Sequence, residues 1–155
     1  MAFFAPCSDA TRYNPRMVLT SVLAAVVQRN EKYLICQRPI GKRHGSLWEF
    51  PGGKLEAGET YLDAARRELA EELGVKVLTV GSPLFSSADP GSDFLIEFVP
   101  TVIDGEPQCF EHLDLKWMPL EEVESLQLAP SDRRFVEFLR SAQLALANNP
   151  FLRSR

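Results

Sequence analysis

The sequence has few cysteines, and they show no metal-binding pattern. Cys7, Cys36 and Cys109 are scattered, with no CxxC or Cys/His spacing, which argues against a zinc site. An odd number of cysteines without an obvious framework favours a reducing compartment. We therefore interpret Cys36 and Cys109 as small hydrophobic residues in or near strands.

Long apolar runs are also absent. No run reaches the length of a membrane-spanning helix, and the first residues, MAFFAPCSDATRYNP, lack the basic region of a signal peptide. We predict a flexible N-terminal arm at 1–16, a single domain at 17–147 and a C-terminal tail at 148–155. By default these features favour a cytoplasmic protein.

Positive charge is not concentrated anywhere in the chain. With 17 basic and 21 acidic residues the formal net charge is −4, which argues against duplex nucleic acid or a membrane surface as partner. A small phosphorylated substrate remains compatible, because a bound metal ion can supply the positive charge. The expected state is a monomer or a homodimer.

Short apolar segments rich in β-branched residues alternate with amphipathic ones. They predict strands at 17–28, 32–38, 47–50, 75–84, 94–103 and 115–118, and helices at 60–73, 119–125 and 132–147. The polar turn at 29–31 suggests that the first two strands form a hairpin. Hairpins between helices favour an α/β or α+β fold with a mixed sheet sandwiched between α-helices.

The helix expected at 60–73 has a recognisable start and end. Thr60 can cap it, with Asp63 three residues later in a capping-box arrangement. Gly74 stands where a helix ends in the left-handed conformation. On the last helix, Asp132 follows Pro130-Ser131 and is expected to serve as the N-cap.

The same helix predicts two adjacent stripes. At about 100° per residue, one stripe is apolar and the other is acidic, so carboxylates lie at the boundary of the core. The apolar stripe contains Leu62, Ala65, Leu69 and Leu73, and the acidic stripe contains Glu68, Glu71 and Glu72. Like charges three and four residues apart repel each other, so a positive partner is expected.

Hard oxygen ligands at this spacing suit Mg²⁺ or Mn²⁺. The preceding Gly52 and Gly53 carry no side chain, so a metal or phosphate can approach their backbone and the Gly52 carbonyl can join the ligands. Arg67 can pair with Glu71 four residues later. The alternative is a solvated acidic helix face without a ligand.

A longer pattern surrounds these residues. Gly53, five residues, Glu59, seven residues and then Arg67-Glu68-Leu69-Ala70-Glu71-Glu72-Leu73-Gly74-Val75 resembles the Nudix box. The segments LWEFPGG and LAPSD, and Glu111 six residues before Trp117, extend the resemblance to MutT-type nucleoside triphosphate pyrophosphohydrolases. LAPSD is especially similar to the cytidine triphosphate pyrophosphohydrolase branch.

The resemblance implies a set of site residues. It makes Glu68, Glu71 and Glu72 metal ligands, helped by the Gly52 carbonyl and Glu111, with Glu59 as a weaker or indirect ligand. The expected catalytic residues are Glu68, Glu111 and Arg67, and either glutamate can be the general base. The implied reaction is hydrolysis of a nucleoside triphosphate to a monophosphate and pyrophosphate.

The resemblance also implies substrate contacts, each with a plainer alternative. Arg38 matches a substrate-contacting position but is equally explained as a surface arginine at a strand end. Lys54, beside Gly53, can meet a phosphate or simply be solvated, and Phe50 can pack near the base or belong to the core. Asp132 matches a residue that reads the edge of the base.

The base and the substrate class stay open at this point. The segment around Ser92 and Asp93 lacks an arginine used against the base by the guanine-oxidation enzyme, which weakens the 8-oxo-dGTP interpretation and leaves cytosine-type nucleotides possible. One alternative is a Nudix hydrolase of another nucleoside diphosphate-X compound. The other is a non-catalytic Nudix-fold module that binds an oxidised base or a protein.

Overall fold

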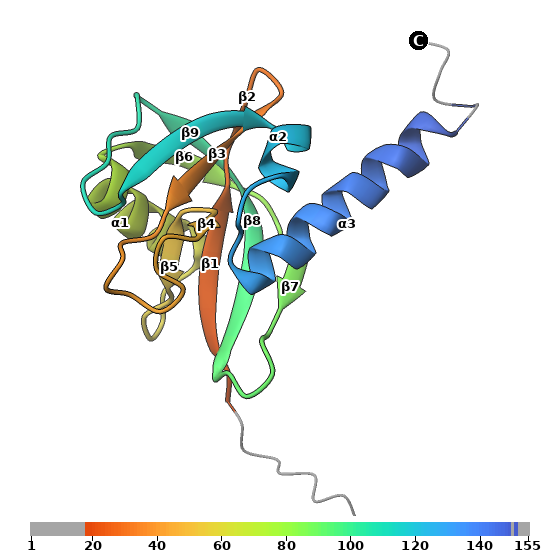
Figure 1. The fold of residues 1–155 in the computed structure, drawn as a ribbon. Helices are drawn as coiled ribbons and strands as arrows, with labels where there is room; N and C mark the ends of the chain where they lie inside the picture. The colour runs from red at the N-terminus through yellow and green to blue at the C-terminus, as the bar shows by residue number, and fades with distance from the viewer. Residues whose placement is uncertain (1–17, 150, 152–155) are drawn as a thin grey trace, which may run out of the picture.

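The structure, a computed structural model, describes residues 18–149 and 151. The arm predicted at 1–16 and most of the tail predicted at 148–155 therefore lie outside the described residues. Figure 1 shows two curled sheets, with α1 against one side and α3 against the other. The expected mixed sheet flanked by helices is confirmed.

The strands form two sheets. In the first, the order is β5 (Gly52–Lys54), β1 (Thr20–Val26), β8 (Phe94–Asp104) and β6 (Lys76–Val80), with β7 (Phe85–Ser87) also on β8. In the second, the order is β2 (Gln28–Arg29), β3 (Lys32–Gln37) and β4 (Trp48–Glu49), with β9 (Asp114–Pro119) also on β3. β1 and β8 are parallel, and the other paired strands are antiparallel.

The predicted hairpin is only partly correct. The turn is present, and Asn30 and Glu31 have φ of 49° and 61°, as a tight hairpin turn requires. However, only the short β2 pairs with β3, whereas β1 belongs to the other sheet. Leu23 and Ala25 face one core and Ala24 and Val26 the other, so β1 is a central strand buried on both faces.

Two apolar clusters lie on opposite sides of β1. The first joins β1 and β8 to α2 (Leu120–Glu124) and α3 (Pro130–Ala147), and it includes an aromatic group of Phe50, Phe98 and Phe135. The second joins the sheet to α1 (Tyr61–Leu73) through Leu69 and Leu73. The two clusters therefore place α1 on one side of β1, and α2 and α3 on the other side.

The ends of α1 follow the sequence prediction. Thr60 accepts a hydrogen bond from the Asp63 N–H, and the Asp63 carboxylate accepts one from the Thr60 N–H, which completes the capping box. Gly74 ends the helix with φ of 67°. These local interactions fix the two ends of α1 and therefore the positions of its acidic residues along the helix.

The start of α3 corrects the prediction for Asp132. The N-cap is Ala129, Pro130 occupies the first turn, and no side chain caps the helix. Proline fits this position because its missing N–H would have no helical partner there. Asp132 therefore lies inside the first turn, with its side chain available for another contact.

Three further features concern the exposure of side chains and the character of the helices. The second half of α3 extends away from the sheets, and Leu146 near its end is 58% exposed. Cys36 is buried in β3, as expected of a small hydrophobic residue in a strand, whereas Cys109 is exposed in the segment between β8 and β9. No described helix has both the length and the apolar character needed to cross a membrane.

The aromatic group provides a test of the fold. Phe98 is fully buried, stacks on Phe135 at a ring-centroid distance of 4.2 Å and meets Phe50 edge to face. We expect Phe98→Ala to lower the free energy of unfolding by about 3–5 kcal/mol because it leaves a cavity. Urea denaturation measures this change. Leu144→Ala, at a position 56% exposed, is the control, and an equal loss in both variants would contradict the assignment of the core.

Candidate functional site

A cavity of about 450 Å³ opens between α1 and the start of α3. Its walls come from the β3–β4 loop, β4, the 50–54 segment, α1, the 89–96 segment, residues 111–112 and residues 129–132. The volume lies within the range of small-molecule sites. The cavity is therefore the candidate site, and most predicted site residues can be placed relative to it.

The backbone of residues 50–52 donates hydrogen bonds to two buried carboxylates. The Phe50 N–H donates to Asp132 Oδ1 at 2.8 Å, and the Gly52 N–H donates to Glu72 Oε2 at 3.2 Å. Pro51 between them has no N–H, and its carbonyl accepts from the Ala25 N–H at 2.7 Å. Two residues along an extended chain correspond to about 7 Å, so the segment separates one carboxylate of α3 from one of α1.

Glu72 occupies the acidic end of the cavity. Its side chain is buried, and burial together with the nearby carboxylates of Glu68, Glu49 and Glu111 raises its pKa to about 8. An ionised carboxylate among like charges is unfavourable without a cation. This accumulation of carboxylate oxygens fits a hard divalent cation.

The two glycines leave the room that this end of the cavity requires. A Cβ on Gly53 would lie 2.2 Å from Cδ of Glu68, so a side chain there would displace the Glu68 carboxylate. A Cβ on Gly52 would lie 2.0 Å from the Leu23 carbonyl oxygen, and Gly52 has φ of 153°. Glycine at both positions thus lets β5 pack on β1 and lets Glu68 lie over the backbone.

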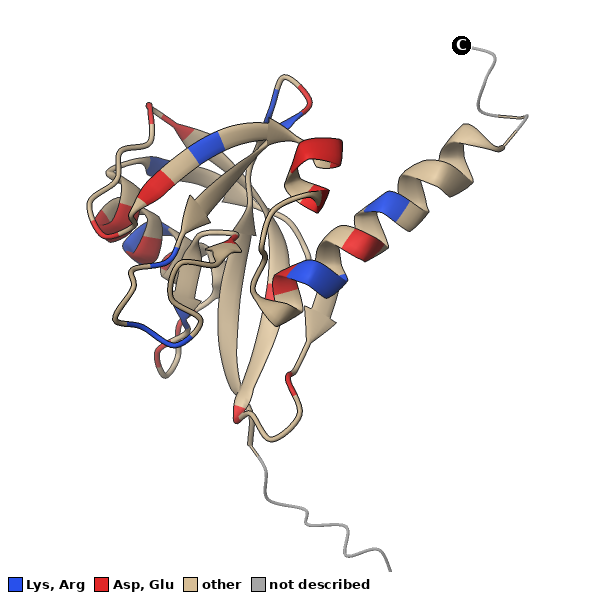
Figure 2. Cartoon of the chain, viewed as in Figure 1, with Lys and Arg blue, Asp and Glu red and all other residues tan. Residues whose placement is uncertain are grey.

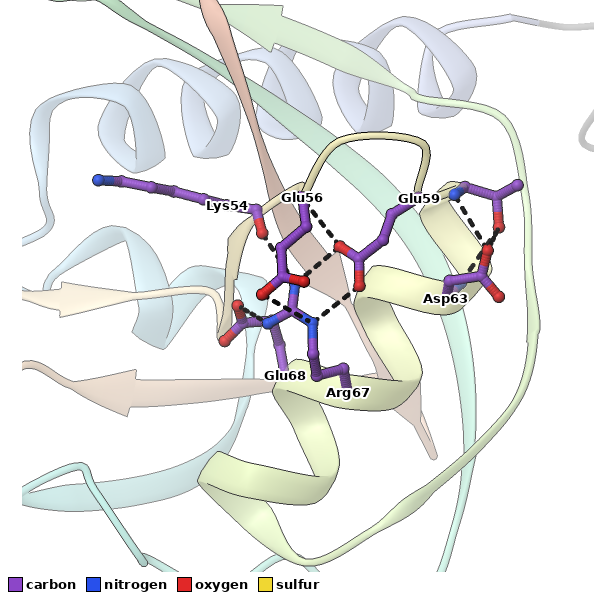
Figure 3. A network of polar contacts seen from close by, with 7 residues as sticks. Lys54, Glu56, Glu59, Asp63, Arg67 and Glu68 are labelled. Carbon is purple, nitrogen blue, oxygen red and sulfur yellow. Dashed lines mark hydrogen bonds and ion pairs between the residues drawn. The ribbon is translucent and has the colours of Figure 1, made fainter.

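Arg67 connects α1 to the loop before it, as Figure 3 shows. Its guanidinium donates to both oxygens of Glu59, at 2.8 and 2.7 Å, to Glu68 Oε1 at 2.6 Å and to the Lys54 carbonyl at 3.0 Å. The hydrogen bonds from Arg67 lower the pKa of Glu59 to about 2. The predicted Arg67–Glu71 pair is wrong, because the guanidinium fork is occupied by Glu59 and Glu68.

Only some of the predicted acidic site residues lie together in the cavity. Glu68, Glu72 and Glu111 line the cavity, whereas Glu71 is exposed and lies outside its lining. Among the described residues, no three His, Cys, Asp or Glu side chains lie close enough to form a ready-made metal cluster. The donor types and the mutual pKa effects fit a divalent cation, while Glu68 is ion-paired with Arg67.

A second charged group also lines the cavity, and it pairs Arg38, named from the sequence, with Glu49 and His112, which sequence reasoning missed. Glu49 Oε2 accepts from Arg38 at 2.6 Å, and Glu49 Oε1 lies 3.5 Å from Nε2 of the buried His112. Arg38 lines the cavity, so its predicted contact with the substrate stays a prediction. Glu49 lies between the buried Trp48 and Phe50, and this alternation was the signal that its side chain points to the other face of the strand.

Asp132 lies at the remaining end of the cavity. It is 6% exposed, and burial, with a contribution from nearby Glu49, raises its pKa well above the ordinary value. Phe50, 3% exposed, belongs to the core and also lines the cavity. Lys54 is exposed, lines the cavity and places its ammonium 4.5 Å from the Phe94 ring centre.

Basic residues form the rim of the cavity. Lys42 and Arg43, in the loop between β3 and β4, line it together with Lys54. Figure 2 shows basic positions in the β3–β4 loop and acidic positions on α1 and α2. The cavity thus combines an acidic end suited to a cation with basic groups suited to an anion.

Comparisons with known proteins agree with this arrangement. The sequence matches the NUDIX domain over residues 17–139. It is 37% identical to a CTP pyrophosphohydrolase of Escherichia coli, over 83% of this chain and 97% of the relative. It is 36% identical to a putative 8-oxo-dGTP diphosphatase 2 of Mycobacterium tuberculosis, over 74% of this chain and 84% of the relative.

Solved structures show the same fold. The solution structure of the E. coli ORF135 protein has a TM-score of 0.70 and 34% identity, covering 84% of this chain and 95% of that chain. The MutT NUDIX hydrolase of Burkholderia pseudomallei has a TM-score of 0.66 and 25% identity, covering 76% of this chain and 95% of that chain. This chain therefore belongs to the Nudix hydrolase family, with MutT-type enzymes among its structural neighbours.

Proposed function

We propose that this Nudix hydrolase cleaves a nucleoside or deoxynucleoside triphosphate to the monophosphate and pyrophosphate in the presence of Mg²⁺ or Mn²⁺. The observation that carries the proposal is the cavity itself, with the box residues Glu68 and Glu72 at one end and Asp132 at the other. Similarity to a CTP pyrophosphohydrolase supports a cytosine nucleotide.

The cation would be held by carboxylates of the box. Glu68 and Glu72, which line the cavity, are the proposed ligands together with the Gly52 carbonyl. Glu71 would join them only by turning inward from its exposed position, Glu111 would serve either the cation or the attacking water, and Glu59 acts indirectly by orienting Arg67. When bound, the cation offsets phosphate charge and makes water more acidic. Arg67 holds Glu68 over Gly53 through its 2.6 Å contact and so limits the positions of that carboxylate.

Glu111 is the better candidate for the general base. Glu68 is engaged by Arg67, whereas Glu111 lines the cavity, is exposed and makes no hydrogen bond or ion pair with a described residue. A base must be able to reach the attacking water and take up its proton. Lys54 and the basic β3–β4 loop would contact the phosphates, while Arg38 orients Glu49.

The nucleobase of the substrate would be recognised by two carboxyl groups in different protonation states. Neutral Asp132 can donate a hydrogen bond, because its pKa is raised, while Oδ1 accepts from the Phe50 N–H. Glu49, paired with Arg38, can accept one. Cytosine offers an acceptor ring nitrogen beside a donor amine, which matches this pair, and uracil reverses both.

The proposal is tested first by a substrate panel. We expect pyrophosphate and monophosphate from CTP or dCTP with Mg²⁺, at least tenfold higher kcat/KM than with UTP, and no turnover in excess chelator. Release of pyrophosphate measures the reaction. Turnover confined to another nucleoside diphosphate-X compound would favour the rival substrate class, and binding without hydrolysis would favour a non-catalytic module.

The acidic end is tested with Glu72→Gln. We expect kcat/KM to fall by about 10²–10³-fold, because glutamine still accepts from the Gly52 N–H but cannot supply a charged oxygen. Steady-state kinetics measure the loss, and thermal unfolding checks the fold. Glu137→Gln, on the exposed part of α3, is the matched control. Unchanged activity of Glu72→Gln would remove this residue from the proposed metal site.

Asp132→Asn tests the protonation state at the other end. Because the folded-state pKa of Asp132 is raised above 3.8, its contribution is fully present at low pH and is lost as pH rises through the folded pKa. Asparagine keeps the acceptor for the Phe50 N–H and cannot ionise. We therefore expect wild type to lose stability relative to the variant as pH rises above the ordinary aspartate pKa and through the raised pKa of the folded state.

Urea midpoints of both proteins across this pH range measure that difference, and a difference independent of pH would contradict it. Because the asparagine amide donates where the neutral carboxyl would, we expect kcat/KM of this variant for the cytosine nucleotide to stay within about threefold of wild type. A large loss with the cytosine nucleotide in Asp132→Asn would show that Asp132 does not read the base as a neutral donor.

A further inference from the structure

A polar network outside the Nudix box joins the turn between β7 and β8 to the start of α3. Arg134 Nε donates to Ser87 Oγ at 2.7 Å, and Arg134 Nη2 donates to Ser131 Oγ at 3.1 Å and to Asp89 Oδ1. Ser131 Oγ also donates to Asp89 Oδ1, at 3.2 Å. Asp89 is thus held by two residues that lie more than 40 positions away in the sequence.

Asp89 borders the same cavity as Asp132. Asp89, Ser131 and Asp132 all line it, and the Asp89 side chain is 21% exposed, so it is anchored without being covered. Both anchoring bonds use Oδ1. None of the hydrogen bonds among the described residues uses Oδ2, and a carboxylate oxygen has lone pairs for further donors.

The position of Asp89 restricts what it could bind. A carboxylate repels the phosphates of a nucleotide, and the basic rim residues and the metal-type carboxylates belong to other walls of the cavity. Asp89 instead neighbours the part of α3 that carries Asp132. A hydrogen-bond donor on the nucleoside is the complementary group, either the exocyclic amine of the base or the 2′-hydroxyl of the sugar.

We propose that Asp89 contacts a hydrogen-bond donor on the nucleoside part of the substrate, and that Arg134 is a positioning residue that holds Asp89 toward the cavity. This inference rests on the proposed nucleotide substrate. Its competitor is a purely structural role, in which the network only fastens the 88–93 turn to α3.

Asp89→Asn separates these roles. Asparagine Oδ1 can still accept from Arg134 and Ser131, while its amide group replaces the free acceptor by a donor. Arg134→Gln removes the anchoring charge, and Arg134→Lys restores the charge without the planar fork. Arg140→Gln is the matched control, because Arg140 lies on the same helix but pairs with Glu121 and Glu124 outside the cavity.

Kinetics of the full chain with CTP, dCTP and UTP provide the first readout. We expect Asp89→Asn to raise KM about tenfold for nucleotides that carry the contacted donor, with kcat changed less than about threefold. Arg134→Gln should shift KM in the same direction, and Arg134→Lys should recover part of the loss. A loss with CTP and dCTP but not UTP assigns the amine, and a loss with CTP and UTP but not dCTP assigns the 2′-hydroxyl.

A uniform loss with all three nucleotides, accompanied by a lower unfolding temperature, would overturn the inference in favour of the structural role. An unchanged KM in Asp89→Asn would overturn it as well. Arg140→Gln should match wild type in both KM and unfolding temperature.

Binding of CMP, dCMP and UMP by calorimetry, without metal, separates this inference from the proposed function. If wild type hydrolyses CTP but Asp89→Asn binds CMP normally, the inference fails and the function stands. If wild type hydrolyses no triphosphate yet Asp89→Asn binds CMP about tenfold more weakly, the function fails and the inference stands. If wild type neither binds nor hydrolyses these nucleotides, both fail.

Discussion

Two backbone N–H groups hold this site together. Phe50 and Gly52 each donate to a buried carboxylate, Asp132 from α3 and Glu72 from α1. The segment between them is fastened to β1 by the hydrogen bond from the Ala25 N–H to the Pro51 carbonyl. One short extended segment thereby sets the separation between the two ends of the cavity, and both helices are placed relative to it.

The chain concentrates negative charge where burial makes charge unfavourable. Glu72 lies near three other carboxylates, and Asp132 lies near Glu49. Two arginines pair with neighbouring carboxylates. Arg67 forms an ion pair with Glu68, and Arg38 forms one with Glu49. Such an arrangement is unfavourable without a compensating cation, and functional sites commonly trade stability for activity in this way.

Local patterns in the sequence predicted local structure well. The capping box at Thr60 and the left-handed Gly74 depend only on neighbouring residues, so they could be assigned from spacing. The strand pairing could not, because β1 looks like a hairpin arm until its two buried faces are seen. The cap predicted at Asp132 was wrong for a related reason, since Pro130 begins the helix and the side chain is drawn to the Phe50 N–H.

The sequence by itself therefore determined the family, the acidic face of α1 and the need for glycine before it, because the box has a fixed spacing within one loop and one helix. The resemblance pointed to Asp132, but only the tertiary structure decided that Glu49 and Asp89 share a cavity with it and with that helix. These residues come from a strand, a turn and a second helix, and no periodicity along the chain records their distance. Sheet pairing and burial, which join distant segments, bring them together.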